Sequence, residues 1–442
     1  MTKIFIYVLL ILSAMSNAQT LLRKASVGIL TSKTKEGLRI DSVVPNSSAD
    51  LLKLKKNDLI LSVNGKPVTT PEDFKQTVMP LRTGDLLEIN FVRDGKNKKN
   101  SGKTIMRPME TSNFADITYD WVKFREGFLR VIVRKPKSLK HMPCILLIPG
   151  YGCGSIENYH LGYNGTLMNE WLKNGYAVVT IEKSGLGDSY NCPPCTEVDL
   201  VTDIESFNAG YNYMEQLDFV EKDHLYIWGH SMGGVIAPEI ARRHKPRGVM
   251  VFGTVFRPWS EFLPEMHRVQ KPLLENMSYE ETEKFVRLIH KVYYEFFVLK
   301  KSRQELFENP EYTAIVRTEL EHKEGNTNMW GRHWRFWQQL DSLDLSVSWS
   351  ETKCPVLVIN GGSDYEQCAP IEPVLIEQTV NSHRPGSATR VQIEDLDHFM
   401  MKSNGFKEAV ENFRNQAYSK GNFNYKISTE TIQWLNKQQG KS

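Results

Sequence analysis

The sequence has little cysteine, no strong excess of either charge, and only one long hydrophobic run. Six cysteines among 442 residues are too few for a disulfide-dense scaffold. A formal net charge of +3, with lysines dispersed along the chain, does not indicate a nucleic-acid-binding protein. A composition that is 40% hydrophobic and 24% charged is typical of a globular protein. Because the chain is longer than one hydrophobic core usually supports, we expect two domains.

The one long hydrophobic run lies at the N-terminus and predicts a secretory signal peptide. Lys3 is followed by the apolar residues 4–12, too few to span a bilayer, and Ser16 and Ala18 supply the small residues that a signal peptidase needs. We expect residues 1–18 to be removed, although an uncleaved anchor is the alternative. No later run is long enough for a membrane helix, so we expect an exported protein, periplasmic or secreted, with no membrane span.

A serine lies between two closely spaced glycines where a strand pattern changes to a helix pattern. The apolar run Leu225–Trp228 predicts a buried strand, and Gly229, Ser231 and Gly233 follow it directly. This spacing is typical of a nucleophile elbow, in which a tight turn leaves room only for glycine beside the serine. We therefore expect Ser231 to be a nucleophile, rather than part of a glycine-rich turn without chemistry.

A nucleophilic serine needs a base and a carboxylate that orients the base, and both follow predicted strands. Asp364 follows the strand that starts at Pro355, and His398 follows a strand near residues 390–393. Asp364 is the predicted acid and His398 the predicted base, with activity rising through a pKa of roughly 6 to 7. The alternatives are Asp395 or Asp397 as the acid, and His230, His267 or His333 as the base.

Strands and helices alternate around the serine, which predicts a doubly wound, mostly parallel sheet covered on both faces. We expect a hairpin near residues 117–133 to lead into strands at 144–148, 177–181 and 225–228 and helices at 167–174 and 198–216. The alternation stops between about 257 and 350, where a helical cap is expected. Tryptophans gather in this interval and predict either a substrate pocket or a subdomain core: Trp259, Trp330, Trp334, Trp337 and Trp349.

Residues 19–108 have short strands and turn signals, and their block SVVPNSSADLLKLKKNDLILSVNGKPV resembles PDZ domains of the bacterial, circularly permuted kind. The resemblance implies a small α+β domain that captures a peptide C-terminus in a loop before the first strand. The best match for that loop is Ser26, Val27, Gly28 and Ile29, although it lacks the usual paired glycines. Packing against the other domain, or dimerisation, is the alternative role. We expect the polar interval 96–112 to be the linker.

Residues 114–440 resemble the α/β-hydrolase family, in its capped serine aminopeptidase-like and esterase-like branch. The matching motifs are LLIPGYGCG, IEKSGLGDS, GHSMGG, PVLVINGGSD and DLDHF. The resemblance implies a domain at 109–442, with the backbone amides of Tyr151 and Met232 as an oxyanion hole and no metal or cofactor. Pro149 stands where many relatives have histidine.

Two questions stay open at the level of sequence: the cysteine pairing and the substrate. The motif Cys192-Pro-Pro-Cys195 favours a local disulfide over a redox dithiol or a metal site, while Cys144 and Cys354 are expected to be small buried residues. A carboxylic ester is the first expected substrate and a short peptide the second. A non-catalytic PDZ scaffold is the alternative of another class.

Overall fold

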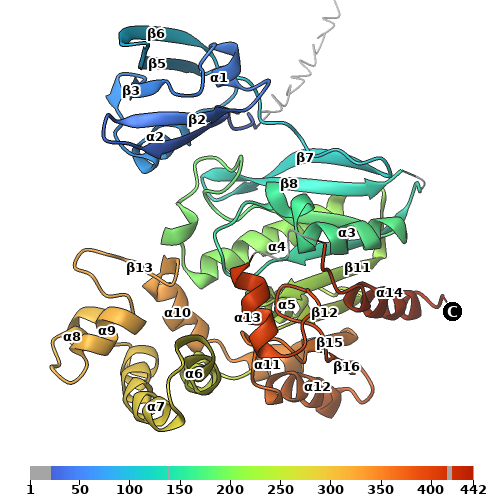
Figure 1. The fold of residues 1–442 in the computed structure, drawn as a ribbon. Coiled ribbons are helices and arrows are strands. Elements are labelled where there is room, and N and C mark those ends of the chain that lie inside the picture. The colour runs from blue at the N-terminus through green and yellow to red at the C-terminus, as the bar shows by residue number, and fades with distance from the viewer. Residues whose placement is uncertain (1–20, 138, 416–420, 442) are drawn as a thin grey trace, which may run out of the picture. The chain divides into compact units, whose positions relative to one another are not determined.

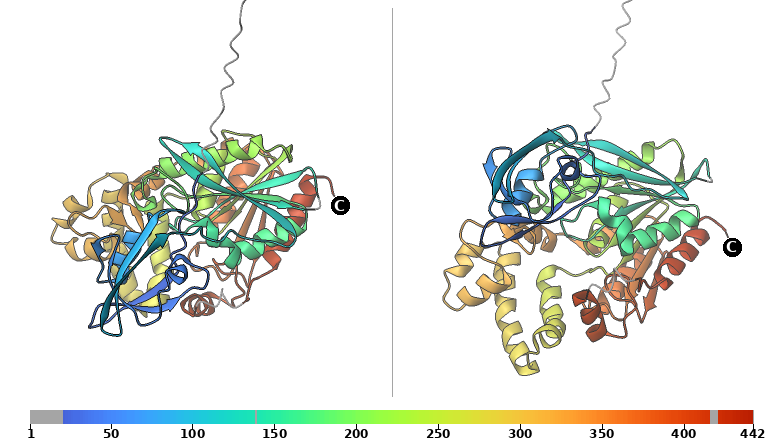
Figure 2. Two further views of the ribbon diagram at one scale, coloured as in Figure 1. Left: turned by 90° about the horizontal axis from the view of Figure 1, so that it is seen from above. Right: turned by 45° about the horizontal axis from the view of Figure 1, so that its top comes forward.

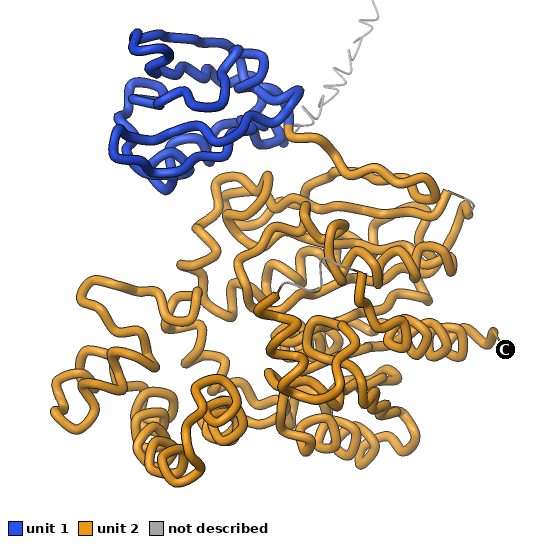
Figure 3. Tube along the Cα trace, in the orientation of Figure 1, with its two compact units in different colours: residues 1–106 blue, residues 107–442 orange. Residues whose placement is uncertain are grey.

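The computed structural model describes residues 21–137, 139–415 and 421–441. It divides into one compact unit that ends at Met106 and a second that begins at Arg107 (Figure 1, Figure 3). The expected signal peptide lies outside the described residues. Each unit has its own hydrophobic core, as a chain of this length requires.

The N-terminal unit is an antiparallel sheet with two helices, in strand order β1-β2-β3-β5-β6 and with β4 paired to β3. Its elements are β1 (Ile29–Lys33), β2 (Leu38–Val43), α1 (Ser48–Leu51), β3 (Leu59–Val63), β4 (Lys66–Pro67), α2 (Pro71–Val78), β5 (Leu86–Arg93) and β6 (Lys96–Lys103). Alternation makes one face of β5 apolar, since Leu87, Ile89 and Phe91 are fully buried. Thr70 and Asp73 form a capping box that starts α2.

Strand β6 shows that the predicted linker was wrong in its first half. Lys96 pairs with Arg93 across a two-residue turn, and the strands remain paired up to Lys103. Asp94 and Gly95 in that turn have φ of 54° and 71°, which is the conformation that two-residue hairpins need. The segment looks like a linker in sequence because most of its side chains are exposed at a sheet edge, where lysines oppose further strand pairing.

The C-terminal unit is built on an eight-stranded sheet of order β16-β15-β12-β11-β9-β10-β8-β7. The strands are β7 (Ala115–Phe124), β8 (Gly127–Pro136), β9 (Met142–Ile148), β10 (Ala177–Ile181), β11 (Val220–His230), β12 (Gly248–Phe252), β15 (Val356–Gly361) and β16 (Ala388–Ile393). All neighbours from β10 to β16 are parallel, while β7 and β8 form the predicted antiparallel hairpin. The prediction of a mostly parallel sheet is confirmed.

Helices cover both faces of this sheet. They are α3 (Tyr163–Lys173), α4 (Leu200–Gln216), α5 (Met232–Ala241), α12 (Ile371–His383) and α14 (Lys426–Gln438). The buried residues of α13 (Phe406–Arg414) belong to a separate small cluster. There are also short 3-10 helices, η1 (Ile156–Leu161) and η2 (Cys195–Glu197). Alternate side chains of β11 enter the two cores: Ile227 packs with α4, α5 and α12, whereas Trp228 packs with α3 and α14. Both are fully buried, which explains why the strand is apolar along its length.

An insertion between β12 and β15 forms the helical region expected as a cap. It consists of α6 (Trp259–Glu275), α7 (Tyr279–Tyr293), the π-helix η3 (Tyr294–Val298), α8 (Arg303–Phe307), α9 (Thr313–Glu319), the hairpin β13 (Asn328–Met329) and β14 (Arg332–His333), α10 (Trp334–Asp341) and α11 (Leu345–Glu351). Helices α6 to α10 gather to one side of the sheet (Figure 1, Figure 2). Across the described ranges, no helix is long and apolar enough to cross a membrane.

Candidate active site

A sharp turn between β11 and α5 carries Ser231. The serine has φ 55° and ψ −122°, a strained conformation for a residue with a side chain. A Cβ on Gly229 would lie 2.4 Å from the carbonyl oxygen of Gly233, and a Cβ on Gly233 would lie 2.1 Å from that of Ile148. Only glycine fits at these two positions, so the strand, turn and helix have the form that the sequence predicts.

His398 and Asp364 are hydrogen-bonded to each other from two neighbouring loops. Asp364 follows β15 and His398 follows β16. The imidazole Nδ1 lies 3.0 and 2.9 Å from the two carboxylate oxygens of Asp364. One of these oxygens also accepts hydrogen bonds from the backbone amides of Glu366, at 3.0 Å, and Gln367, at 2.8 Å. The fixed carboxylate holds the proton on Nδ1 and leaves Nε2 of His398 free to accept another.

The surroundings of His398 make it a stronger base than a free histidine. Burial disfavours the imidazolium, but the charge and hydrogen bond of Asp364, together with the charges of Glu366 and Asp397, outweigh burial and raise the pKa of His398 above its ordinary value. Burial also raises the pKa of Glu366. A base of this strength suits the removal of a proton from a serine hydroxyl.

Ser231 and His398 line one cavity of about 410 Å³, within the usual size range of small-molecule sites. Tyr151 and Met232, the predicted oxyanion residues, line it too. Most of the remaining wall is apolar: Val235, Val255, Trp259, Phe262, Met266, Phe399 and Phe413. Glu366 adds a carboxylate to this wall. The fold thus brings together side chains from four loops that are far apart in sequence.

The two rival aspartates are bound to other groups. Asp395 forms an ion pair of 2.9 Å with Lys426. Asp397 accepts hydrogen bonds from the backbone amide of Met401 and from the hydroxyl of Ser403. Neither aspartate is hydrogen-bonded to His398, which leaves Asp364 as its carboxylate partner.

The other candidate histidines also have structural contacts. His230 donates from Nε2 to the backbone carbonyl of His398 at 2.8 Å, and burial lowers the pKa of His230 to about 3, so this ring is neutral. His267 lies 2.7 Å from the hydroxyl of Tyr293 inside the insertion, and His333 caps α10. Within the described ranges, no group of three or more histidine, cysteine, aspartate or glutamate residues is placed to hold a metal ion.

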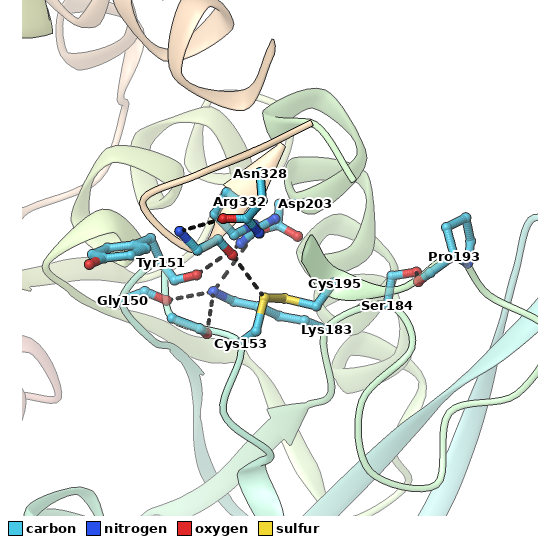
Figure 4. The surroundings of a disulfide bond; sticks show 12 residues. Gly150, Tyr151, Cys153, Lys183, Ser184, Pro193, Cys195, Asp203, Asn328 and Arg332 are labelled. Atoms are coloured by element: carbon cyan, nitrogen blue, oxygen red, sulfur yellow. Dashed lines mark hydrogen bonds and ion pairs between the residues drawn. A yellow bond between two sulfur atoms is a disulfide. The ribbon is translucent and has the colours of Figure 1, made fainter. Parts of the chain in front are cut away.

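The cysteine pairing differs from the prediction of a local disulfide between Cys192 and Cys195. Cys195 is bonded to Cys153, which lies 42 positions earlier in the sequence, with a Cα–Cα distance of 5.8 Å (Figure 4). Cys192 is free. Pro194 is extended, with φ −55° and ψ 141°, and so carries Cys195 away from Cys192 and onto η2. Cys144 and Cys354 are buried and free, as expected.

The loop predicted for peptide capture precedes β1, an edge strand of the N-terminal unit. The carbonyls of Ser26, Val27 and Gly28 accept hydrogen bonds from the segment that leads into α1. Among the described residues, the amides of Val27 and Gly28 have no hydrogen-bond partner. Gly28 has φ 74°, and a Cβ there would lie 2.2 Å from the Cβ of Ser47, so the position requires glycine.

The sheet order, the elbow before α5 and the hydrogen-bonded pair after β15 and β16 define an α/β-hydrolase. Comparison with known families then identifies the branch. Residues 144–365, which are 222 of the 442, match the family described as Serine aminopeptidase, S33, and the chain belongs to that family. Residues 25–103 match the PDZ domain family, which confirms the prediction that the N-terminal unit is a PDZ domain.

Individual relatives are distant. Esterase EstD of Thermotoga maritima is 22% identical over 211 residues, which are 48% of this chain and 42% of EstD. A probable periplasmic serine endoprotease, DegP-like, of Ectopseudomonas mendocina is 38% identical over 63 residues, 14% of this chain and 13% of that protein. The chain thus spans less than half the length of these relatives. The solved structure of Est1E from Butyrivibrio proteoclasticus has a TM-score of 0.44, with 14% identity over 73% of this chain and 99% of Est1E.

Several charged residues near the cavity were not singled out from the sequence. Lys183 lies inside the motif IEKSGLGDS, directly after the apolar strand β10, and this position is the only sequence signal for it. Asp203 lies in the first turn of α4, and Arg332 lies in the insertion. No sequence motif near Asp203 or Arg332 points to Lys183. The three residues come together only in the folded chain.

Proposed function

We propose that the chain is an exported serine hydrolase that cleaves a carboxylic ester through an acyl-enzyme. The observation that carries the proposal is that Ser231, on its strained turn, and His398, hydrogen-bonded to Asp364, line the same cavity. A serine hydroxyl becomes a nucleophile only beside a base that a carboxylate orients. Membership of a serine hydrolase family and the similarity to a protein named an esterase support the choice of bond.

In the proposed mechanism, Nε2 of His398 accepts the proton of Ser231 Oγ as that oxygen attacks the ester carbonyl. The backbone amides of Tyr151 and Met232 stabilise the resulting oxyanion. The intermediate collapses, His398 protonates the leaving alcohol, and the acyl group remains on Ser231. Water then attacks this acyl-enzyme with His398 again as the base, which releases the acid and restores the serine. Asp364 keeps the imidazole in the required tautomer throughout.

Labelling with a fluorophosphonate probe tests the nucleophile. We expect wild-type protein to be labelled and to hydrolyse nitrophenyl esters, and we expect Ser231→Ala to do neither. Ser184→Ala is a matched control, because the Ser184 hydroxyl is hydrogen-bonded to a backbone carbonyl and lies outside the cavity. Absence of label on the wild type would favour the non-catalytic PDZ scaffold, and label that persists in Ser231→Ala would exclude this serine as the nucleophile.

A peptidase that acts on short peptides is the second candidate, and Glu366 favours it. This carboxylate lines the cavity beside Ser231 and also a smaller pocket of about 290 Å³ in the insertion, with Trp259, Trp330 and Trp337. A carboxylate at this place can bind the ammonium group of a peptide N-terminus. Nitrophenyl esters compared with aminoacyl and dipeptidyl naphthylamides separate the two candidates. A clear preference for the amides would overturn the ester assignment.

For the N-terminal unit, we propose that the loop Ser26–Ile29 binds the C-terminus of a peptide, because two of its amides lack partners among the described residues. A hexapeptide library with free C-termini should bind, and the same library with amidated C-termini should not. Equal binding would favour the alternative of a packing or dimerisation role. Deletion of this unit should leave the kinetics on small esters unchanged, but it should reduce action on large substrates.

We also propose export, with cleavage of residues 1–18. The segment has the three parts of a signal peptide, and the disulfide Cys153–Cys195 suits an oxidising compartment. Sequencing of the protein recovered from the periplasm or the medium tests this. The expected first residue is Gln19, and an intact N-terminus on membrane-bound protein would support the uncleaved anchor.

A further inference from the structure

Two buried cations hold the carbonyl groups of the loop that carries Tyr151. The Nζ of Lys183 donates to the carbonyl of Gly150 at 2.6 Å and to that of Gly152 at 3.2 Å. The Nη1 of Arg332 donates to the carbonyl of Tyr151 at 2.9 Å. Three consecutive carbonyls are therefore fixed, by one residue after β10 and one residue of the insertion (Figure 4).

The two cations share one carboxylate. Asp203 lies 2.8 Å from Nη1 of Arg332 and 3.9 Å from Nζ of Lys183. Side chains in this group are almost completely buried, with 3% of Lys183 and none of Arg332 or Asp203 exposed. Two buried positive charges face one negative charge, so the oxygens of the Gly150–Gly152 loop supply the remaining stabilisation.

The direction of these carbonyls determines where the Tyr151 amide points. In a trans peptide, the C=O and N–H groups point in opposite directions, and the Gly150–Tyr151 peptide is trans. Because Lys183 holds the Gly150 carbonyl, the N–H of Tyr151 points away from Lys183. Ser231 lies close to this peptide group, since a Cβ added to Gly150 would be 3.7 Å from its Oγ. Gly150 and Tyr151 both line the cavity, so the contact that holds the carbonyl also fixes the direction of an amide group at the cavity wall.

We propose that Lys183 and Arg332 are positioning residues that orient the Tyr151 amide as an oxyanion donor. The inference rests on the proposed hydrolase function, which it deepens. Neither side chain lines the cavity, so both act through the loop backbone. Lys183 orients the peptide group that bears the donor, and Arg332 holds the next carbonyl and ties the loop to the insertion.

The charge state of Lys183 adds a pH dependence to this arrangement. Burial, with a smaller effect from the like charge of Arg332, lowers the pKa of Lys183 to about 7, although Asp203 opposes the shift. Below this pKa the ammonium group binds both carbonyls and is attracted to Asp203. As the pH rises through it, the charge is lost and only weaker neutral N–H donors remain, so turnover is expected to fall.

The test compares Lys183→Met with Lys183→Arg in the full chain, with nitrophenyl acetate as the substrate. Methionine keeps an unbranched apolar stem and leaves Asp203 paired with Arg332. We expect Lys183→Met to lower kcat tenfold or more and to change KM by no more than about twofold. The fall in kcat should stay below roughly 10²–10³-fold, which is the effect of losing an oxyanion donor completely. Lys183→Arg should recover part of the loss, and its kcat should no longer fall near pH 7 because a guanidinium does not titrate there.

A matched control separates positioning from general loosening of the fold. Arg134→Met removes another buried arginine, which forms an ion pair of 2.6 Å with Glu110. Neither of these residues lines the cavity. Its kcat should stay near the wild-type value, and hydrogen exchange of the segment 149–153 should be faster in Lys183→Met than in this control. An unchanged kcat in Lys183→Met, or an equal fall of kcat in both variants, would overturn the inference. Fluorophosphonate labelling of the wild type would still support the proposed hydrolase function in that case. Wild type that is neither labelled nor active would overturn both.

Discussion

His398 and Asp364 are joined by contacts of 2.9 and 3.0 Å although they lie 34 positions apart in the sequence. The pair forms because β15 and β16 are parallel neighbours, so the loops that follow them meet at the same edge of the sheet. The carboxylate stabilises the imidazolium and raises the pKa of His398. A contact between two loops thereby sets the basicity of the group expected to activate Ser231.

The first prediction concerns pH. Only neutral His398 can accept the serine proton, so kcat/KM for a neutral ester should rise with pH through a pKa above 6.5. In Asp364→Asn this rise should move to lower pH, and kcat should fall by roughly 10⁴ because the tautomer is no longer fixed. Asp395→Asn, which affects an exposed ion pair with Lys426, is the control and should change neither. A rate that stays flat from acid to neutral pH would contradict the role of His398.

The second prediction concerns the turn at Ser231. Gly233→Ala should lower the free energy of unfolding by about 3 kcal/mol, because the added Cβ would meet the carbonyl of Ile148 at 2.1 Å. Gly154→Ala is the control, since nothing lies within 4 Å of its Cβ, and its change should stay below about 0.5 kcal/mol. Urea denaturation measures both values, and equal stability of the two variants would contradict the close approach of the turn to β9.

The third prediction concerns the disulfide. Replacing Cys153 and Cys195 by serine should lower the free energy of unfolding by roughly 2 to 4 kcal/mol, as expected for a closed loop of this length. Ester turnover should fall as well, because Cys153 lies directly after the Gly150–Gly152 loop. Cys192→Ser should do neither, since Cys192 is free. If Cys192→Ser proves as damaging as the double variant, the pairing of Cys153 with Cys195 is wrong.

The fourth prediction concerns substrate charge. If Glu366 binds an ammonium group, Glu366→Gln should lower kcat/KM for alanyl naphthylamide roughly tenfold or more. The N-acetylated form of the same substrate has no positive charge and should be affected much less. Both should be measured near pH 7, where the alanyl amine is still mostly protonated, and a change in the pKa of His398 affects both substrates equally. An equal effect on both substrates would remove the main support for the peptidase candidate.

The central features of this chain were predictable because their signals are local. The spacing of Gly229 and Gly233 around Ser231 is a local motif, and a strand buried on both faces is apolar along its whole length. The contact between Asp364 and His398 could be anticipated because each follows a strand, and parallel strands bring their ends together. Local pattern and fold agree at these positions.

Contacts that depend on long-range packing could not be predicted. The Cys153–Cys195 pairing depends on where η2 meets the loop after β9, and the short Cys192–Cys195 spacing pointed to the wrong partner. Strand β6 is polar because it lies at an edge, so its composition resembles a linker. The ion pairs of Asp203 with Lys183 and Arg332 join three segments that share no periodicity.

The hydrogen bond from Arg332 to the Tyr151 carbonyl has a consequence for engineering. Inserted helical regions are natural units to exchange between hydrolases, because they are contiguous in sequence and border the substrate. In this chain, such an exchange would also remove a support of the Gly150–Gly152 loop, for which we propose the oxyanion role, and leave Asp203 with Lys183 alone. If the loop supplies the oxyanion donor as proposed, we expect a chimaera to lose turnover on every substrate, and that loss would conceal any gain in selectivity unless the graft keeps an arginine at position 332.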